Sequence, residues 1–135
     1  MPFALALIVL LALLAVFQLA LVCGAPLGHF AWGGQHRVLP ARMRVGSLIA
    51  IVIYALIALV SLDRIGAIQV FPNAVAVVAM WVIVAYFALG IAMNAMSKSR
   101  SERAVMVPLT IVLTVLSLLI ALGFLFGGYE ITDNG

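Results

Sequence analysis

Four apolar stretches, each long enough to cross a bilayer, constrain this chain more than any other feature. They cover residues 3–22, 45–62, 74–96 and 104–126. About 17–25 helical residues span the hydrocarbon core of a membrane. Because 67% of all residues are hydrophobic and only 8% are charged, a soluble domain of this length could not bury its apolar surface. The sequence therefore predicts an all-α fold, a single polytopic membrane domain over residues 1–135 built as a four-transmembrane-helix bundle.

Charged and capping residues mark the ends of these stretches. The second stretch stops at Asp63 and Arg64, whose charges are costly inside a bilayer. Asn73 is a plausible N-cap of the third stretch, and Ser99 and Glu102 have the spacing of a capping box before the fourth. The first stretch lacks a basic segment before it, so we expect a retained helix, not a cleaved signal peptide. Residues 127–135 are expected to form a short polar tail.

The basic residues lie in two of the connections and predict the orientation. The segment 23–44, named loop one, and the segment 97–103, named loop three, contain three Lys or Arg residues each, whereas the connection between them contains only Arg64. By the positive-inside rule, loops one and three are cytoplasmic and both termini lie outside. Since these charges sit in short loops, their function is to set topology, and nucleic acid is not an expected partner.

Loop one is the segment that least resembles a membrane helix. Its glycines and prolines argue against a continuous helix, yet Phe30 and Trp32 are too apolar for a solvated loop. We expect an interfacial or partly re-entrant segment. Glycine-rich turns and guanidinium groups are typical of phosphate and carboxylate sites, and lipid headgroups are the natural anions there. The candidate ligand-binding residues are His29, Trp32, Gly33, Gly34, Gln35, His36, Arg37, Arg42 and Arg44. Alternatively, the arginines only enforce topology and the glycines only permit tight turns.

Metal binding, proton coupling and catalysis have weaker support. His29 and His36 are two histidines separated by a glycine pair, short of a closed zinc shell, so no metal or cofactor is expected. His36 as a general base would need a reacting group within hydrogen-bond reach. Small multidrug exporters depend on an acidic residue in their first helix, where this chain offers only Gln18, which cannot titrate. We therefore expect a protein that is not an enzyme.

Small and polar side chains form stripes on the predicted helices, where helices in lipid contact one another. One stripe contains Ser47, Tyr54 and Ser61. The third helix has a face of alanines, Ala85, Ala88 and Ala92. A second face, formed by Tyr86, Gly90 and Asn94, lies nearly opposite. The candidate packing or pore residues are Tyr54, Tyr86, Gly90, Asn94, Thr110, Thr114 and Ser117. Internal packing, a polar cavity and a subunit interface all remain open for them.

Two blocks of sequence resemble a known family. The first contains Gly-Ala-Pro-Leu-Gly at 24–28, Ala-Trp-Gly-Gly at 31–34, Val-Leu-Pro at 38–40 and Arg44; the second runs from Met93 to Ser99 and on through Glu102 to Pro108. Together they resemble an uncharacterised family of small four-helix bacterial integral membrane proteins. Leu27 stands where members of that family often have a second aromatic residue. The resemblance implies four helices and the bacterial cytoplasmic (inner) membrane, and it implies no activity.

These features predict a non-enzymatic membrane protein whose loop one binds an anionic lipid headgroup, a small anion or a protein partner. The alternative is a homo-oligomeric channel or transporter-like protein that uses the polar stripes. A membrane enzyme acting on lipid is a third possibility. The expected partners are membrane lipids, further copies of the chain or another membrane protein.

Overall fold

The computed structural model describes residues 2–123, which form four long helices and no strand. The helices are α1 (Pro2–Val22), α2 (Ala41–Arg64), α3 (Asn73–Ala95) and α4 (Arg100–Leu122). Two single-turn 3₁₀ helices, η1 (Gly28–Phe30) and η2 (Trp32–Gly34), lie in loop one. All four long helices are long and apolar enough to cross a membrane, with mean hydropathies of 2.5 to 3.0. The predicted all-α fold is confirmed, and the chain is a multi-pass membrane protein.

Two helices extend beyond the apolar stretches that predicted them. The predicted spans 45–62 and 104–126 begin later than α2 and α4, which start at Ala41 and Arg100. Apolar length measures the hydrocarbon crossing, whereas a helix continues into the interface, where its charged side chains are hydrated. The predictions 3–22 and 74–96 agree with α1 and α3 to within one residue at each end. The end of the fourth predicted span and the tail 127–135 lie outside the described residues.

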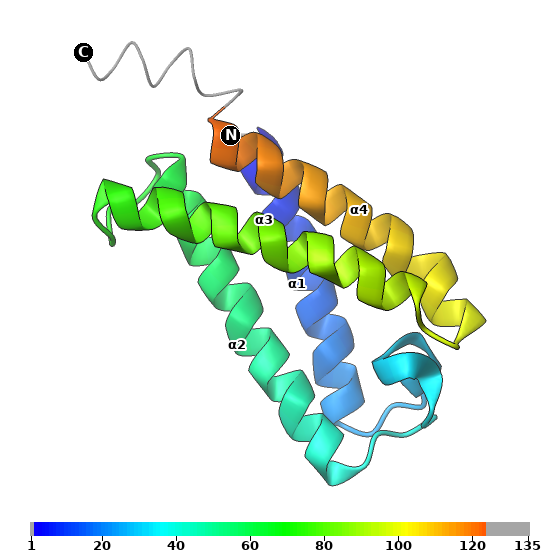
Figure 1. Ribbon diagram of the computed structural model, residues 1–135. Helices are drawn as coiled ribbons and strands as arrows, with labels where there is room; N and C mark the ends of the chain where they lie inside the picture. The colour runs from blue at the N-terminus through cyan, green and yellow to red at the C-terminus, as the bar shows by residue number, and fades with distance from the viewer. Residues whose placement is uncertain (1, 124–135) are drawn as a thin grey trace.

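The four helices form a bundle that is open on one side (Figure 1). α1 packs against α2 and α4, and α3 packs along α4. α2 and α3 meet near their connection and diverge toward the other end, where loop one lies (Figure 1). Asp63 organises that connection, because its Oδ2 accepts the backbone N–H groups of Val70 at 2.6 Å and Phe71 at 2.8 Å.

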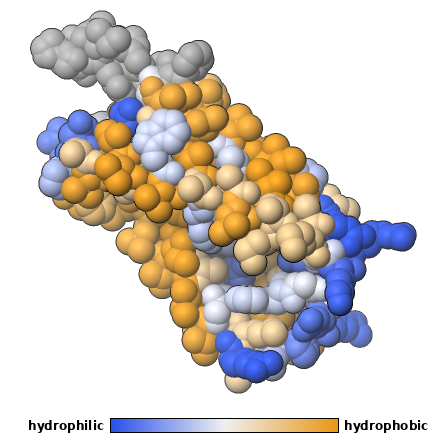
Figure 2. Space-filling view, in the orientation of Figure 1, coloured by the Kyte–Doolittle hydropathy of each residue, from blue (hydrophilic) through white to orange (hydrophobic). Residues whose placement is uncertain are grey.

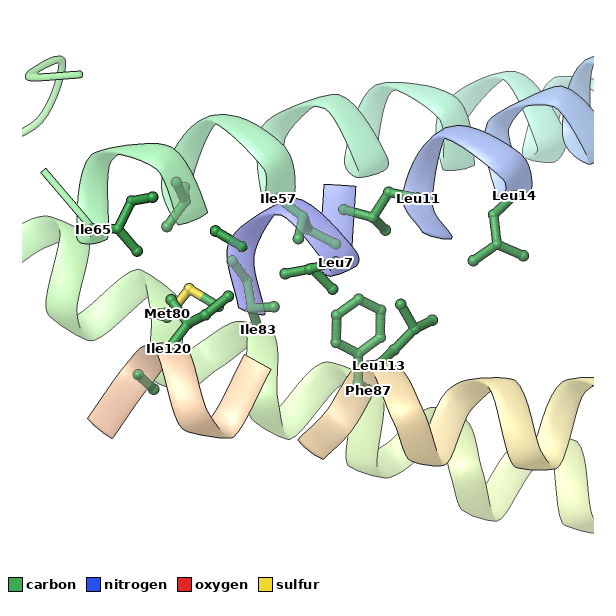
Figure 3. Close-up of a cluster of buried hydrophobic side chains, with 13 residues drawn as sticks. Leu7, Leu11, Leu14, Ile57, Ile65, Met80, Ile83, Phe87, Leu113 and Ile120 are labelled. Atoms are coloured by element: carbon green, nitrogen blue, oxygen red, sulfur yellow. The ribbon is translucent and has the colours of Figure 1, made fainter. Parts of the chain in front are cut away.

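The core sits where α1 crosses the other three helices (Figure 3). Leu7, Met80 and Ile120 are fully buried there, and Phe87 and Leu113 extend the cluster toward loop one. Large apolar side chains cover the outside of the bundle, including Leu5, Val52 and Leu89, each more than half exposed. Figure 2 shows this apolar surface in orange and the hydrophilic side chains gathered at the ends of the helices. Such a surface matches lipid as its solvent.

Candidate functional site

Loop one is a folded unit with its own small core. Leu21, Ala31 and Leu39 are buried together. The backbone reverses at η2, where Trp32, Gly33 and Gly34 have φ values of 53°, 77° and 74° in succession. A left-handed conformation at a residue other than glycine costs about 1–2 kcal/mol, so the contacts of Trp32 must hold it there. The loop is therefore packed, as the sequence predicted from its apolar residues.

Loop one is clamped onto the start of α4. The Ser99 hydroxyl donates a hydrogen bond to the His29 carbonyl oxygen, and the Gly33 N–H donates to Glu102 Oε1 at 3.2 Å. Gly34 lies so close to Ser99 that a Cβ atom on it would stand 2.4 Å from the Ser99 Cβ. These three contacts join residues about 70 positions apart in the chain.

The same clamp explains an unusual helix cap. Ser99 is the N-cap of α4, and its Oγ accepts the Glu102 N–H at 3.2 Å, as the capping-box spacing predicted. In a complete capping box, the glutamate side chain accepts the N-cap N–H in return. Here the Ser99 N–H donates instead to Ser97 Oγ at 3.0 Å, and the Glu102 carboxylate turns to Gly33. A capping residue thereby becomes a tertiary contact.

Trp32 holds the other side of loop one against α2. Its indole N–H donates to the buried Ser47 Oγ at 3.4 Å, and its ring lies over Gly46, where a Cβ atom would approach Trp32 carbons to 2.8 Å. Arg44 Nε donates to the Leu39 carbonyl oxygen at 2.8 Å, which ties the end of the loop to the first turn of α2. Loop one therefore bridges α2 and α4 at the open end of the bundle.

Beneath loop one, a groove of about 570 Å³ opens between the helices. Figure 2 shows it as a hollow bordered by hydrophilic side chains at the loop end and by apolar side chains elsewhere. All four helices and loop one contribute to its walls. Six aromatic residues line it: Phe17, Phe30, Trp32, Tyr54, Tyr86 and Phe87. The volume lies in the range of about 300–1,000 Å³ that small-molecule sites occupy.

A few polar groups interrupt these apolar walls. Gln18 Nε2 donates to the Tyr54 hydroxyl at 3.3 Å, and Asn94 Nδ2 donates to Thr110 Oγ1 at 2.7 Å. Glu102 is the one charged side chain among the lining residues that the structure describes, and it is only 7% exposed. The groove is thus amphipathic, with its carboxylate at the end that loop one covers.

The predicted ligand-binding residues of loop one separate into three groups. Trp32 and Gly33 line the groove. A second group holds the loop in place. His29 and Gly34 contact the start of α4, and Arg44 donates a hydrogen bond to the Leu39 carbonyl oxygen. The side chains of Gln35, Arg37 and Arg42 are exposed at the end of the bundle, and that of His36 is half-buried.

The predicted packing or pore residues gather more closely than expected. Five of them line the groove together: Tyr54, Tyr86, Gly90, Asn94 and Thr110. Thr114 and Ser117 do not line it: the Thr114 hydroxyl donates to the Thr110 carbonyl oxygen at 2.7 Å, and Ser117 is fully buried. The alanine face of α3 is exposed at Ala85, Ala88 and Ala92.

Sequence reasoning missed Glu102 as a site residue. Its position in a charged connection and its capping spacing both predicted a hydrated helix start. Its burial follows from the folding of loop one over α4, which no local pattern encodes. The sequence contained only a partial indication of this contact. Loop one carries exposed N–H groups in glycine-rich turns, and Glu102 is the acidic residue nearest to them on the same predicted side of the membrane.

No family model, curated protein or solved structure matches this chain. The resemblance to small bacterial membrane proteins therefore stays a prediction. Within residues 2–123, no three His, Cys, Asp or Glu side chains lie together in a way that could hold a metal ion.

Proposed function

We propose that the protein is a non-enzymatic protein of the bacterial cytoplasmic membrane that binds anionic lipid headgroups at its loop-one end. The observation that carries this proposal is the clamp between loop one and α4, which brings the basic residues of loops one and three to one end of the bundle (Figure 1). Basic side chains near an anionic membrane surface each contribute about 1 kcal/mol to lipid attraction.

Four of these six basic side chains are free to meet a headgroup. Arg37, Arg42, Lys98 and Arg100 are exposed. The other two support backbone: Arg44 as described above, and Arg103 by donating from Nη1 to the Ser97 carbonyl oxygen at 2.5 Å. Trp32 lies at the same end and is 44% exposed, as expected of an aromatic residue at headgroup depth. The proposed headgroup site is therefore the exposed surface at the loop-one end of the bundle.

Lipid binding is tested by replacing the two exposed arginines of loop one. Native mass spectrometry from nanodiscs of mixed phosphatidylglycerol and phosphatidylcholine should show retained phosphatidylglycerol on the wild type. In Arg37→Ala/Arg42→Ala, we expect about thirtyfold less retention, since two charge contacts of about 1 kcal/mol each are lost. Val38→Ala is the matched control, because it changes an exposed, uncharged side chain of the same loop. Equal retention in all three proteins would refute the proposal, and an adduct of another mass would identify a small anion or protein partner.

The proposed orientation places loops one and three in the cytoplasm, and Cys23 reports on it. Cys23 is exposed at the loop-one end of α1, so burial does not protect its thiol. A membrane-impermeant maleimide should leave it unlabelled in intact cells and label it after permeabilisation. Labelling of intact cells would invert the topology and place the basic end outside.

A second candidate is a homo-oligomeric, transporter-like assembly, favoured by the exposed alanine face of α3. Small residues allow close helix contacts in lipid, and Ala85, Ala88 and Ala92 are exposed on α3. The same mass spectra report the number of subunits. Spectra that contain only the monomer would exclude this candidate.

A further inference from the structure

We infer that the groove beneath loop one binds a hydrophobic organic cation, for which Glu102 is the counter-ion. This site is separate from the proposed lipid site, which uses the exposed arginines at the loop-one end of the bundle. The inference rests on three features of the groove: a buried carboxylate without a cationic partner, the absence of basic side chains from the described lining, and aromatic walls.

Glu102 is an uncompensated charge. Buried carboxylates are normally paired with a cation or held by several hydrogen bonds, because removing them from water is costly. The Glu102 carboxylate accepts one hydrogen bond, from the Gly33 N–H at 3.2 Å. Among residues 2–123, it makes no ion pair. The second oxygen is therefore available to a positively charged ligand.

The surrounding backbone does not cancel this charge. Glu102 lies in the first turn of α4, where the helix N-terminus carries only about +0.5 charge. This partial charge stabilises the carboxylate but does not neutralise it. The basic residues of loops one and three do not line the groove. Four of them are exposed to water, where ions screen them over about 10 Å, and the half-buried Arg44 and Arg103 donate to backbone carbonyl oxygens.

The aromatic walls suit a bulky cation. Cations are attracted to the faces of Trp and Tyr, and the attraction grows when water is excluded. Trp32, Tyr54 and Tyr86 line the groove near the polar groups, and phenylalanines extend the walls. The groove has residues of both α2 and α3 in its walls and is open at the surface (Figure 2), so a hydrophobic ligand can enter from the lipid. An anion of the same shape would meet only Glu102 as a charged side chain and be repelled.

The test compares two ions of nearly identical shape and opposite charge. The full-length protein in phosphatidylcholine nanodiscs is titrated with tetraphenylphosphonium or with tetraphenylborate, and empty nanodiscs give the partitioning background. We expect saturable binding of one phosphonium per chain and no saturable binding of the borate. Equal binding of the two ions, or none of either, would overturn the inference.

Glu102→Gln isolates the charge. The glutamine side-chain oxygen can still accept the Gly33 N–H, so loop one should stay clamped, while phosphonium binding should weaken by about tenfold or more, the effect of losing one desolvated charge contact. Tyr86→Leu should weaken binding about threefold. Trp81→Leu is its matched control, because Trp81 is equally exposed on α3 and does not line the groove.

The affinity and the unfolding midpoint of Glu102→Gln separate loss of the charge from loss of folding. An unchanged phosphonium affinity in Glu102→Gln would refute Glu102 as the counter-ion. If this variant has a lower unfolding midpoint than the wild type, the inference is judged by the wild-type protein alone. It then requires that the wild type binds the phosphonium in preference to the borate. Arg37→Ala/Arg42→Ala should retain phosphonium binding, so loss of lipid retention and loss of cation binding are distinguishable.

Discussion

Replacing Gly28 with alanine is expected to force apart the two halves of loop one. A Cβ atom at this position would stand 1.8 Å from the His36 carbonyl oxygen and 2.8 Å from that of Arg37. Both are backbone atoms, so no side-chain rotation can relieve the clash. The Gly28 N–H also donates to the Arg37 carbonyl oxygen at 2.8 Å, and separating the two segments breaks this bond. We expect a loss of about 3 kcal/mol in the stability of the folded loop, the upper end of overpacking costs.

Gly33→Ala is the matched control. No atom lies within 4 Å of a Cβ built on Gly33, so the only cost is its φ of 77°, about 1 kcal/mol. Thermal unfolding in detergent and the rate of tryptic cleavage at Arg37 measure the two variants. Gly28→Ala should lower the midpoint clearly more and speed tryptic cleavage after Arg37, because the backbone at Arg37 is then no longer held by Gly28. Equal behaviour of the two variants would mean that the two halves of loop one are not in the contact described above.

The helices were predictable because lipid imposes a simple rule on them. Every backbone polar group in the hydrocarbon must be paired within a helix, so apolar length alone identified α1 and α3 almost to the residue. The apolar stretches for α2 and α4 begin four residues after the helices do, although the capping-box spacing at Ser99 marked the true start of α4. Arg42 and Arg100 are exposed, and helix and loop are both compatible with an exposed charged side chain, so hydropathy carries no information there.

The groove was only partly predictable. The polar stripes predicted Tyr54, Asn94 and Thr110 as residues that face other helices, because such side chains turn away from lipid and toward one another. Sequence spacing could not predict which side chains hydrogen-bond to one another. The bonds Gln18–Tyr54 and Asn94–Thr110 depend on which helices pack together. Loop one was predicted to hold ligand-binding residues, and spacing could not predict that one of them, Gly34, also packs against Ser99 at the start of α4.

The second large effect is expected at Ser99, whose hydroxyl has two roles. It caps α4 by accepting the Glu102 N–H, and it fixes loop one by donating to the His29 carbonyl oxygen. Ser99→Ala removes both. Losing an N-cap costs about 1 kcal/mol, and losing a partly buried hydrogen bond costs about 1 kcal/mol more. We therefore expect a total loss of about 2 kcal/mol, measured by thermal unfolding followed by circular dichroism.

Ser99→Gly separates the two roles. Glycine is nearly as good an N-cap as serine, within a few tenths of a kcal/mol, but it cannot donate to His29. This variant should lose about 1 kcal/mol, the contribution of the clamp. Ser101→Ala is the control, since Ser101 lies in the same helical turn and shows no side-chain hydrogen bond within residues 2–123. Trp32 emission in a Trp81→Phe background reports the loop directly, because Trp32 leaves Ser47 and Gly46 when the loop detaches. If emission stays unchanged in Ser99→Gly, the Trp32 contacts and the Gly33–Glu102 hydrogen bond hold loop one without Ser99, and the Ser99 hydroxyl serves only to cap the helix.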